Sequence, residues 1–176
     1  MNIISGHLKN YKISTPEDNS FHPMGSREKL ALFNMISSYL PSSVVLDAFA
    51  GSGAIGLESL SLGAKKVVFL EKNPKIAKNL RQNLENLPPE FKESTSIVVN
   101  DATKFASDES FDIIIADPPY DDFRPKSLEN IINFLKKDGI LVLSSPKSLP
   151  VPTFPDLELE KTRTYAAAAI SIYRKI

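Results

Sequence analysis

The strongest chemical signal in the sequence is the motif Asp117-Pro118-Pro119-Tyr120, which follows an apolar run at residues 111–116. An exocyclic amine on a nucleic-acid base is a poor nucleophile, because its lone pair is delocalised into the ring. The Asp117 carboxylate and the Pro118 carbonyl can hold the two amine hydrogens, and the two prolines keep these acceptors fixed. The Tyr120 ring, without its hydroxyl, suffices to stack on the base. The motif predicts methyl transfer to such an amine; the alternative is a rigid turn with an aspartate cap.

A second motif is the glycine-rich turn Gly51-Ser52-Gly53-Ala54-Ile55-Gly56, which lies between an apolar run and a helical pattern. Glu71 follows Gly51 by twenty positions, as in nucleotide sites where the acid binds ribose hydroxyls. Asp47 argues against a dinucleotide, because a pyrophosphate needs N–H groups rather than a carboxylate. It can instead pair with the ammonium of S-adenosylmethionine. We therefore predict that cofactor; the alternatives are a tight turn without a ligand and a capping role for Asp47.

Further cofactor contacts are expected where the third predicted strand ends. The Asp101 carboxylate can accept a hydrogen bond from the adenine amine, and the Ala102 N–H can face the adenine ring. A capping role for Asp101 over residues 103–106 is the alternative. The full predicted cofactor set is Asp47, Ala50, Gly51, Ser52, Gly53, Glu71, Asp101 and Ala102.

Short β-branched runs alternate with helical patterns, which indicates an α/β fold with a mostly parallel sheet covered on both faces. The strands are predicted at residues 44–49, 67–71, 96–100, 111–116, 140–144, 157–161 and 168–173, and the helices at 27–40, 74–87 and 125–137. The first helix is expected to bury Leu30, Phe33, Ile36 and Leu40. We predict a Rossmann-like sheet of seven strands that ends with an antiparallel strand. Residues 1–24 should form a hairpin leader, and residues 25–176 a single cofactor-binding domain.

Composition narrows the classes of function. The 176 residues include no cysteine and two histidines, which excludes a disulfide framework and a thiol nucleophile and leaves no expected metal site. No apolar run approaches the roughly 18 residues of a membrane span, and no signal peptide is evident, so we expect a cytoplasmic protein without a membrane partner. The 21 basic and 21 acidic residues cancel, so any attraction to phosphate must be local.

Local basic clusters are the candidates for substrate contacts. We predict that Lys9, Lys12, Arg27 and Lys29 bind substrate, because they lie outside the other motifs. Further basic pairs near the end of the chain are Lys161 with Arg163 and Arg174 with Lys175. The alternative for each cluster is an ordinary solvated face.

With these motifs together, the chain resembles the class I methyltransferases, and in particular the bacterial 16S rRNA guanine-N2 methyltransferases of the RsmD type. The residues that carry the resemblance are Asp47 to Glu58, Asp117 to Tyr120, Ile3-Ile4-Ser5-Gly6 with Leu8-Lys9, His22-Pro23 to Leu32-Phe33-Asn34, and Ala169 to Arg174. The resemblance implies methylation of the N2 amine of a guanine in 16S rRNA. It also implies an assembled or partly assembled small ribosomal subunit as substrate, with ribosomal proteins contributing to docking. We further expect a monomer.

The chain departs from the family pattern at three places. His22-Pro23-Met24 stands where the family usually has Arg-Pro-Thr, in a loop expected near cofactor and substrate, so His22 joins the predicted substrate contacts. Leu30 replaces an acidic residue, and Ala166 replaces a glycine. These departures put the choice of target in doubt more than the chemistry.

Four rival functions remain. An adenine-N6 DNA methyltransferase shares the diproline turn but generally adds a target-recognition domain, for which the chain has no room. A glutamine-N5 protein methyltransferase usually carries asparagine in place of Asp117. A cofactor-binding partner with weak activity is compatible with the altered loop at residues 22–24. An NAD-binding module is disfavoured by Asp47 and by the lack of groups suited to hydride transfer.

Overall fold

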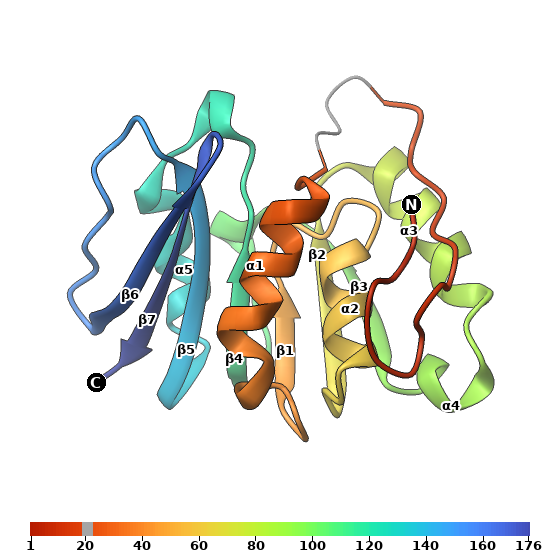
Figure 1. Ribbon diagram of the computed structural model, residues 1–176. Helices are drawn as coiled ribbons and strands as arrows, with labels where there is room; N and C mark the ends of the chain where they lie inside the picture. The colour runs from red at the N-terminus through yellow and green to blue at the C-terminus, as the bar shows by residue number, and fades with distance from the viewer. Residues whose placement is uncertain (19–22) are drawn as a thin grey trace.

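Seven strands form one mixed sheet in the order β3-β2-β1-β4-β5-β7-β6 (Figure 1). The structure is a computed structural model that describes residues 1–18 and 23–176. The strands are β1 (Val44–Asp47), β2 (Lys66–Glu71), β3 (Thr95–Val99), β4 (Phe111–Ala116), β5 (Leu135–Pro146), β6 (Leu157–Tyr165) and β7 (Ala168–Lys175). Strands β1 to β5 are parallel, and β7 pairs antiparallel with both β5 and β6. The predicted Rossmann-like fold is confirmed.

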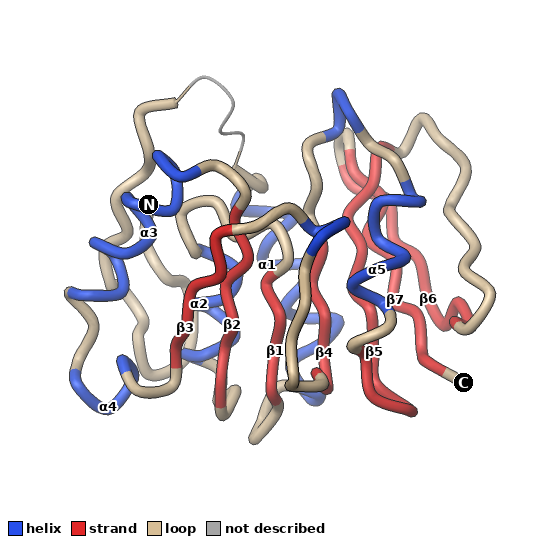
Figure 2. Tube along the Cα trace, turned by 180° about the vertical axis from the view of Figure 1, so that it is seen from behind, coloured by secondary structure: helices blue, strands red, loops and turns tan. Residues whose placement is uncertain are grey.

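Helices cover both faces of the sheet (Figures 1 and 2). The α-helices are α1 (Ser26–Ile36), α2 (Ala54–Ser61), α3 (Pro74–Glu85), α4 (Pro89–Lys92) and α5 (Glu129–Ile132). The 3-10 helices are η1 (Ser37–Tyr39), η2 (Ala102–Lys104), η3 (Tyr120–Asp122) and η4 (Pro125–Leu128). We call the face that packs against α1, α2 and α3 the α1 face, and the opposite one, against α5, the α5 face. Along β5 the side chains alternate, with Ile140 and Val142 in the α1-face core and Leu141 and Leu143 in the α5-face core.

Helix α3 begins where its capping residue predicts. The Asn73 side chain accepts hydrogen bonds from the backbone N–H of Lys75 (2.9 Å) and of Ile76 (3.5 Å), and Pro74 occupies the first helical position. Both features satisfy or remove donors that a helix start leaves without partners. This helix therefore starts directly after β2, next to the acid at the end of that strand.

Two predicted helices differ from the structure. The helix expected at residues 125–137 is wrong, because the chain forms only the short η4 and α5 before β5 begins at Leu135, which pairs with Phe111. Lys136 lies in this strand and donates to Asp112 (2.8 Å), so strand pairing overrides the local helical pattern. In α1 the buried residues are Lys29, Leu32, Phe33 and Ile36, whereas Leu30 is 45% exposed.

The leader packs against the α1 face as an open hairpin. Its two arms pair through one isolated bridge, Asn2 with Lys12, and form no longer strand within residues 1–18. Ile3, Leu8 and Ile13 are buried in the α1-face core. The described part of the leader thus adds apolar side chains to the main core.

Candidate active site

Three carboxylates meet at the carboxyl ends of neighbouring strands. Asp47 ends β1, Glu71 ends β2, and Asp117 directly follows β4. Strand β1 pairs with both β2 and β4, so the three residues lie side by side at one edge of the sheet. Burial raises the pKa of Asp47, and the negative charges of Asp117 and Glu71 raise it further. This edge is where ligands bind in open α/β sheets, and its charge favours a cationic ligand.

The glycine-rich turn shapes the floor beside these carboxylates. Gly53 has a φ of 85°, a left-handed conformation that side chains rarely adopt, and a Cβ there would lie 2.5 Å from the Leu80 side chain. A Cβ on Gly56 would lie 2.3 Å from the Phe69 ring. The second glycine therefore lets α2 pack closely on β2, and the first lets the chain turn tightly above the sheet.

Asp47 is buried and bonded to the turn that follows it. Its side chain accepts a hydrogen bond from the Gly56 backbone N–H (2.8 Å), so the capping role considered as an alternative is present. Loss of water around this 2% exposed residue raises the pKa of the Asp47 carboxyl to about 7. A cation beside this carboxylate would stabilise its ionised form.

Glu71 links the glycine-rich turn to the start of α3. One carboxylate oxygen accepts a hydrogen bond from Gly51 N–H (2.9 Å), and the other accepts one from Asn73 N–H (2.8 Å). A carboxylate oxygen can accept more than one hydrogen bond, so these contacts leave capacity for ligand hydroxyls. The geometry is compatible with the predicted ribose contact.

At the end of β3, Asp101 caps η2, as the alternative interpretation held. One of its carboxylate oxygens accepts hydrogen bonds from the Thr103 N–H (2.9 Å) and hydroxyl (2.6 Å), and these bonds lower the pKa of Asp101. The Ala102 carbonyl accepts a hydrogen bond from the Asn130 side chain (2.8 Å). The cap and this bond fix the segment, while its adenine contact stays a prediction.

Asn83 holds the glycine-rich turn in place and was missed from the sequence. This buried α3 residue donates to the Ser52 carbonyl (2.9 Å) and to the Ser14 carbonyl (2.9 Å), and accepts from the Ser14 N–H (3.0 Å). It thereby ties the leader to the turn. The available signal was an amide on the apolar face of α3, next to Leu84.

The diproline turn contains a partly buried hydrogen-bond network. Burial raises the pKa of Asp117 to about 6, and a hydrogen bond from Ser144 acts against this shift. The Tyr120 hydroxyl lies 2.5 Å from the Ser144 hydroxyl. Pro118 is buried and Pro119 exposed, so the turn projects from the sheet edge. The Tyr120 hydroxyl therefore has a structural role beyond any stacking by its ring.

Ser144 is the second residue that sequence reasoning missed. It is 1% exposed, near the end of β5, and contacts both ends of the motif through Asp117 and Tyr120. The signal was a serine at a position of β5 where alternation from Ile140 and Val142 predicts an apolar residue.

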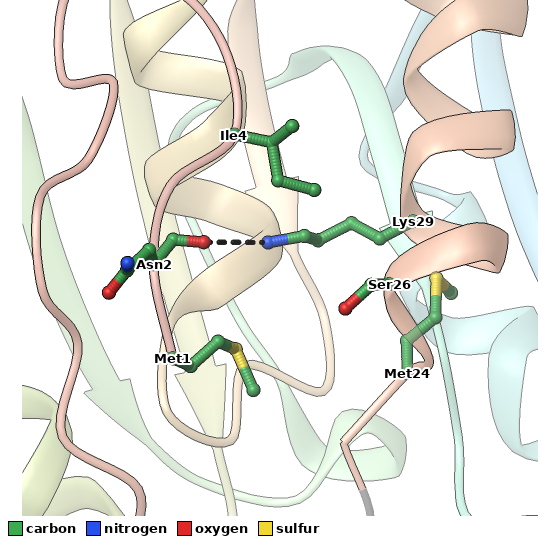
Figure 3. A pocket seen from close by; sticks show the side chains of 6 residues that line it. All are labelled: Met1, Asn2, Ile4, Met24, Ser26 and Lys29. Atoms are coloured by element: carbon green, nitrogen blue, oxygen red, sulfur yellow. Dashed lines mark hydrogen bonds between the residues drawn. The ribbon is translucent and has the colours of Figure 1, made fainter.

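The basic residues predicted to bind substrate differ in where they lie in the structure. The prediction for Lys29 is wrong: it is 3% exposed, and its amine lies 3.3 Å from the Glu58 carboxylate and 3.5 Å from the Asn2 carbonyl (Figure 3). Lys9 lies in the leader turn, where His7 N–H donates to Ser61 at the far end of α2. Helix α2 begins beyond the carboxyl end of β1 and ends at Ser61, shortly before β2, so this turn lies toward the amino ends of the strands and away from the carboxylates. Lys9 is exposed there and stays a predicted contact of a large substrate.

The other basic candidates remain predicted substrate contacts. Lys12 and Arg27 are exposed, and Arg27 lies in the first turn of α1. Burial is the main cause of the raised pKa of Tyr120, and the charges of Asp117 and of Glu28, the neighbour of Arg27, raise it further. His22 lies outside the described residues.

A groove separates the leader from α1 (Figure 3). It encloses about 440 Å³ and is lined by Met1, Asn2, Ile4, Met24, Ser26 and Lys29. The Lys29 side chain crosses it from α1 to the leader, and the amine is already paired with Glu58. Among residues 1–18 and 23–176 there is no cluster of side chains suited to a metal ion, and no helix long and apolar enough to cross a membrane.

Comparison with known proteins gives a consistent family. Residues 1–174 match the family described as conserved hypothetical protein 95. Ribosomal RNA small subunit methyltransferase D of Haemophilus influenzae is 30% identical over 179 residues, covering 98% of this chain and 92% of the relative. The protein of that name from Escherichia coli K12 is 30% identical over 183 residues, covering 98% and 89%.

Solved structures agree with the sequence comparison. A structure from Escherichia coli described as a methyltransferase superposes with a TM-score of 0.87 at 25% identity, covering 99% of this chain and 97% of that one. A second, a methylase from Haemophilus influenzae, gives a TM-score of 0.78 at 27% identity. The fold, the family match and the full-length relatives together show that the chain belongs to the conserved hypothetical protein 95 family, the RsmD family of methyltransferases.

Proposed function

We propose that this protein methylates the N2 amine of a guanine in 16S rRNA, with S-adenosylmethionine as methyl donor and an assembled or partly assembled small ribosomal subunit as substrate. The observation that carries the proposal is the position of Asp117-Pro118-Pro119-Tyr120 beside the glycine-rich turn, at the carboxyl edge of the sheet. The names of the full-length relatives support ribosomal RNA of the small subunit as the target class.

The residues at the sheet edge fit this cofactor. Asp47 would face the ammonium, Glu71 the ribose hydroxyls, and the segment at Asp101 and Ala102 the adenine. Gly53 supplies a turn that a side chain would obstruct, since a Cβ there meets Leu80. The carboxylates beside the turn disfavour a pyrophosphate. When bound, the cofactor supplies a sulfonium-activated methyl group.

The chain's own groups then prepare the amine. The Asp117 carboxylate and the Pro118 carbonyl accept hydrogen bonds from the two amine hydrogens, which draws the nitrogen lone pair out of conjugation with the ring. The Tyr120 ring stacks on the guanine and fixes its plane. The Ser144 hydroxyl forms hydrogen bonds with both Asp117 and Tyr120 and so fixes their positions. The acceptors are positioned before the substrate arrives, so little reorganisation is needed during transfer.

Cofactor affinity should depend on pH through Asp47. The pKa of its carboxyl is about 7, and only the ionised form attracts an ammonium. We expect the affinity for S-adenosylhomocysteine, which keeps the ammonium, to fall about tenfold from about pH 8 to about pH 6. Isothermal titration measures this. Asp47→Asn should bind weakly at both pH values, and equal affinity of the parent protein at both would contradict the assignment of Asp47.

The function itself is tested by mapping modified nucleosides. Small subunits from cells without this gene should gain one N2-methylguanosine in 16S rRNA when incubated with the protein and S-adenosylmethionine, and mass spectrometry of RNA fragments should locate it. Methylated adenine, methylated glutamine in protein, or no product would each overturn the guanine assignment. S-adenosylhomocysteine binding without any product would identify a cofactor-binding partner instead.

A further inference from the structure

The pairing of neighbouring strands connects a basic residue of the edge strand to the strand that ends at the catalytic turn. Ser144 of β5 pairs with Ile170 of β7, and Ile170 pairs with Arg163 of the edge strand β6. On the other side of β5, Leu143 pairs with Ala116, the residue before Asp117. The guanidinium-bearing position is therefore two strands from Ser144, or roughly 10 Å across the sheet.

The same register decides the face on which Arg163 projects. Residues directly opposite each other on paired strands project to the same face of a sheet. Ile170 belongs to the α1-face core, so Arg163 and Ser144 both project on the α1 face. The next position on this face of β6 is Lys161, which pairs with Ile172, another α1-face core residue. Two basic residues thus lie on the face where Ser144 bonds to Tyr120.

These two residues differ in their pairing from other basic residues nearby. Arg163 and Lys161 are exposed, and no ion pair of the described residues includes either of them. By contrast, Arg174 on β7 is paired with Glu160, and Lys136 with Asp112. Two unpaired cations on a face that leads to the catalytic turn suit an anionic chain. Charged residues also protect an edge strand from pairing with another chain, and that role alone would leave RNA binding unchanged.

We propose that Arg163 and Lys161 bind phosphates of the RNA strand that carries the target base. This inference rests on the proposed function and adds the direction of the RNA: from Tyr120 past the covered α1 face of β7, where Ile170 and Ile172 are buried, to the exposed side chains of the edge strand β6. Arginine and lysine on one strand, two residues apart, can contact successive phosphates without reading the base sequence. Because the protein is neutral overall, attraction to RNA must come from local basic surfaces such as this one.

The test compares two double variants with the same loss of charge. Arg163→Gln with Lys161→Gln removes the proposed surface. Lys65→Gln with Lys92→Gln is the control, because both lysines are exposed and precede β2 and β3 at the opposite edge of the sheet. Binding of a single-stranded RNA oligonucleotide is measured as a function of salt, and methylation of undermethylated small subunits is measured in parallel.

The proposed surface should contribute about 0.7 per phosphate contact to the salt slope, so the Arg163/Lys161 variant should lose about 1.4. Its KM for subunits should rise while its affinity for S-adenosylhomocysteine stays that of the parent, and the control should match the parent in all three. A parent-like slope in the Arg163/Lys161 variant overturns the inference while the methylation result still supports the function. A reduced slope with no methylguanosine from the parent overturns the function but leaves the RNA surface standing.

Discussion

Replacing Asp117 by alanine should lower the turnover number about 10²–10³-fold, by analogy with the loss of one fixed hydrogen-bond donor from an oxyanion hole. The carboxylate is held at the end of β4, and its pKa of about 6 leaves it ionised and able to accept a hydrogen bond near neutral pH. The contact matters most in the transition state, when the amine loses conjugation. Single-turnover methylation of small subunits measures the effect.

Two controls separate this role from general damage. Asp117→Ala should bind S-adenosylhomocysteine at least as well as the parent at neutral pH, because removing the Asp117 charge removes one cause of the raised Asp47 pKa. Ser144→Ala keeps the carboxylate but removes the hydrogen bond that lowers its pKa. Its turnover should therefore decline at a higher pH than the parent's as the solution is acidified. An Asp117→Ala protein that keeps most of its turnover would show that the motif is only a rigid turn.

The three carboxylates of the site could be predicted because topology alone brings them together. Asp47, Glu71 and Asp117 each follow an apolar run, and parallel strands place their carboxyl ends at one edge of the sheet. No side-chain geometry is needed for that conclusion. The glycine-rich turn is predictable for the same reason, since its position between a strand and a helix is a local property of the chain.

Asn83 and Ser144 could not be assigned in this way. Each is a polar residue at a buried position, which a sequence shows only as an interruption of an apolar pattern. Their partners Ser14 and Tyr120 lie 69 and 24 residues away along the chain. Only the three-dimensional structure shows which distant polar group satisfies a buried one.

The buried stripe of α1 explains why Lys29 was misinterpreted. Apolar spacing favours Leu30 for the core, yet the helix turns Lys29 inward with Leu32 and Phe33 and leaves Leu30 at the surface. A lysine is almost never buried unless it is paired with an opposite charge, and here that charge is Glu58 on α2. The carboxylate is contributed by another helix, so α1 alone contains no sign of the pairing.

Replacing Glu58 by alanine should therefore destabilise the fold by about 3–5 kcal/mol, the usual result of removing one partner from a buried ion pair. Glu58 is completely buried and lies 3.3 Å from the Lys29 amine. Its carboxylate also accepts hydrogen bonds from the N–H of Ile4 (2.9 and 3.1 Å) and of Ser5 (2.7 Å). The change leaves a buried cation and two backbone donors without these partners, and urea unfolding measures the free energy lost.

A matched set of variants assigns this loss to the ion pair. Glu109→Ala breaks the exposed pair with Lys66 and should cost at most about 1 kcal/mol. Glu58→Gln combined with Lys29→Met should recover most of the stability that Glu58→Ala loses, because the amide oxygen can still accept from Ile4 and Ser5 and no cation is buried. Proteolysis should then cut within residues 1–18 faster in Glu58→Ala than in the double variant. A Glu58→Ala protein within about 0.5 kcal/mol of the parent would mean that neither the ion pair nor the leader contacts hold the α1 face together.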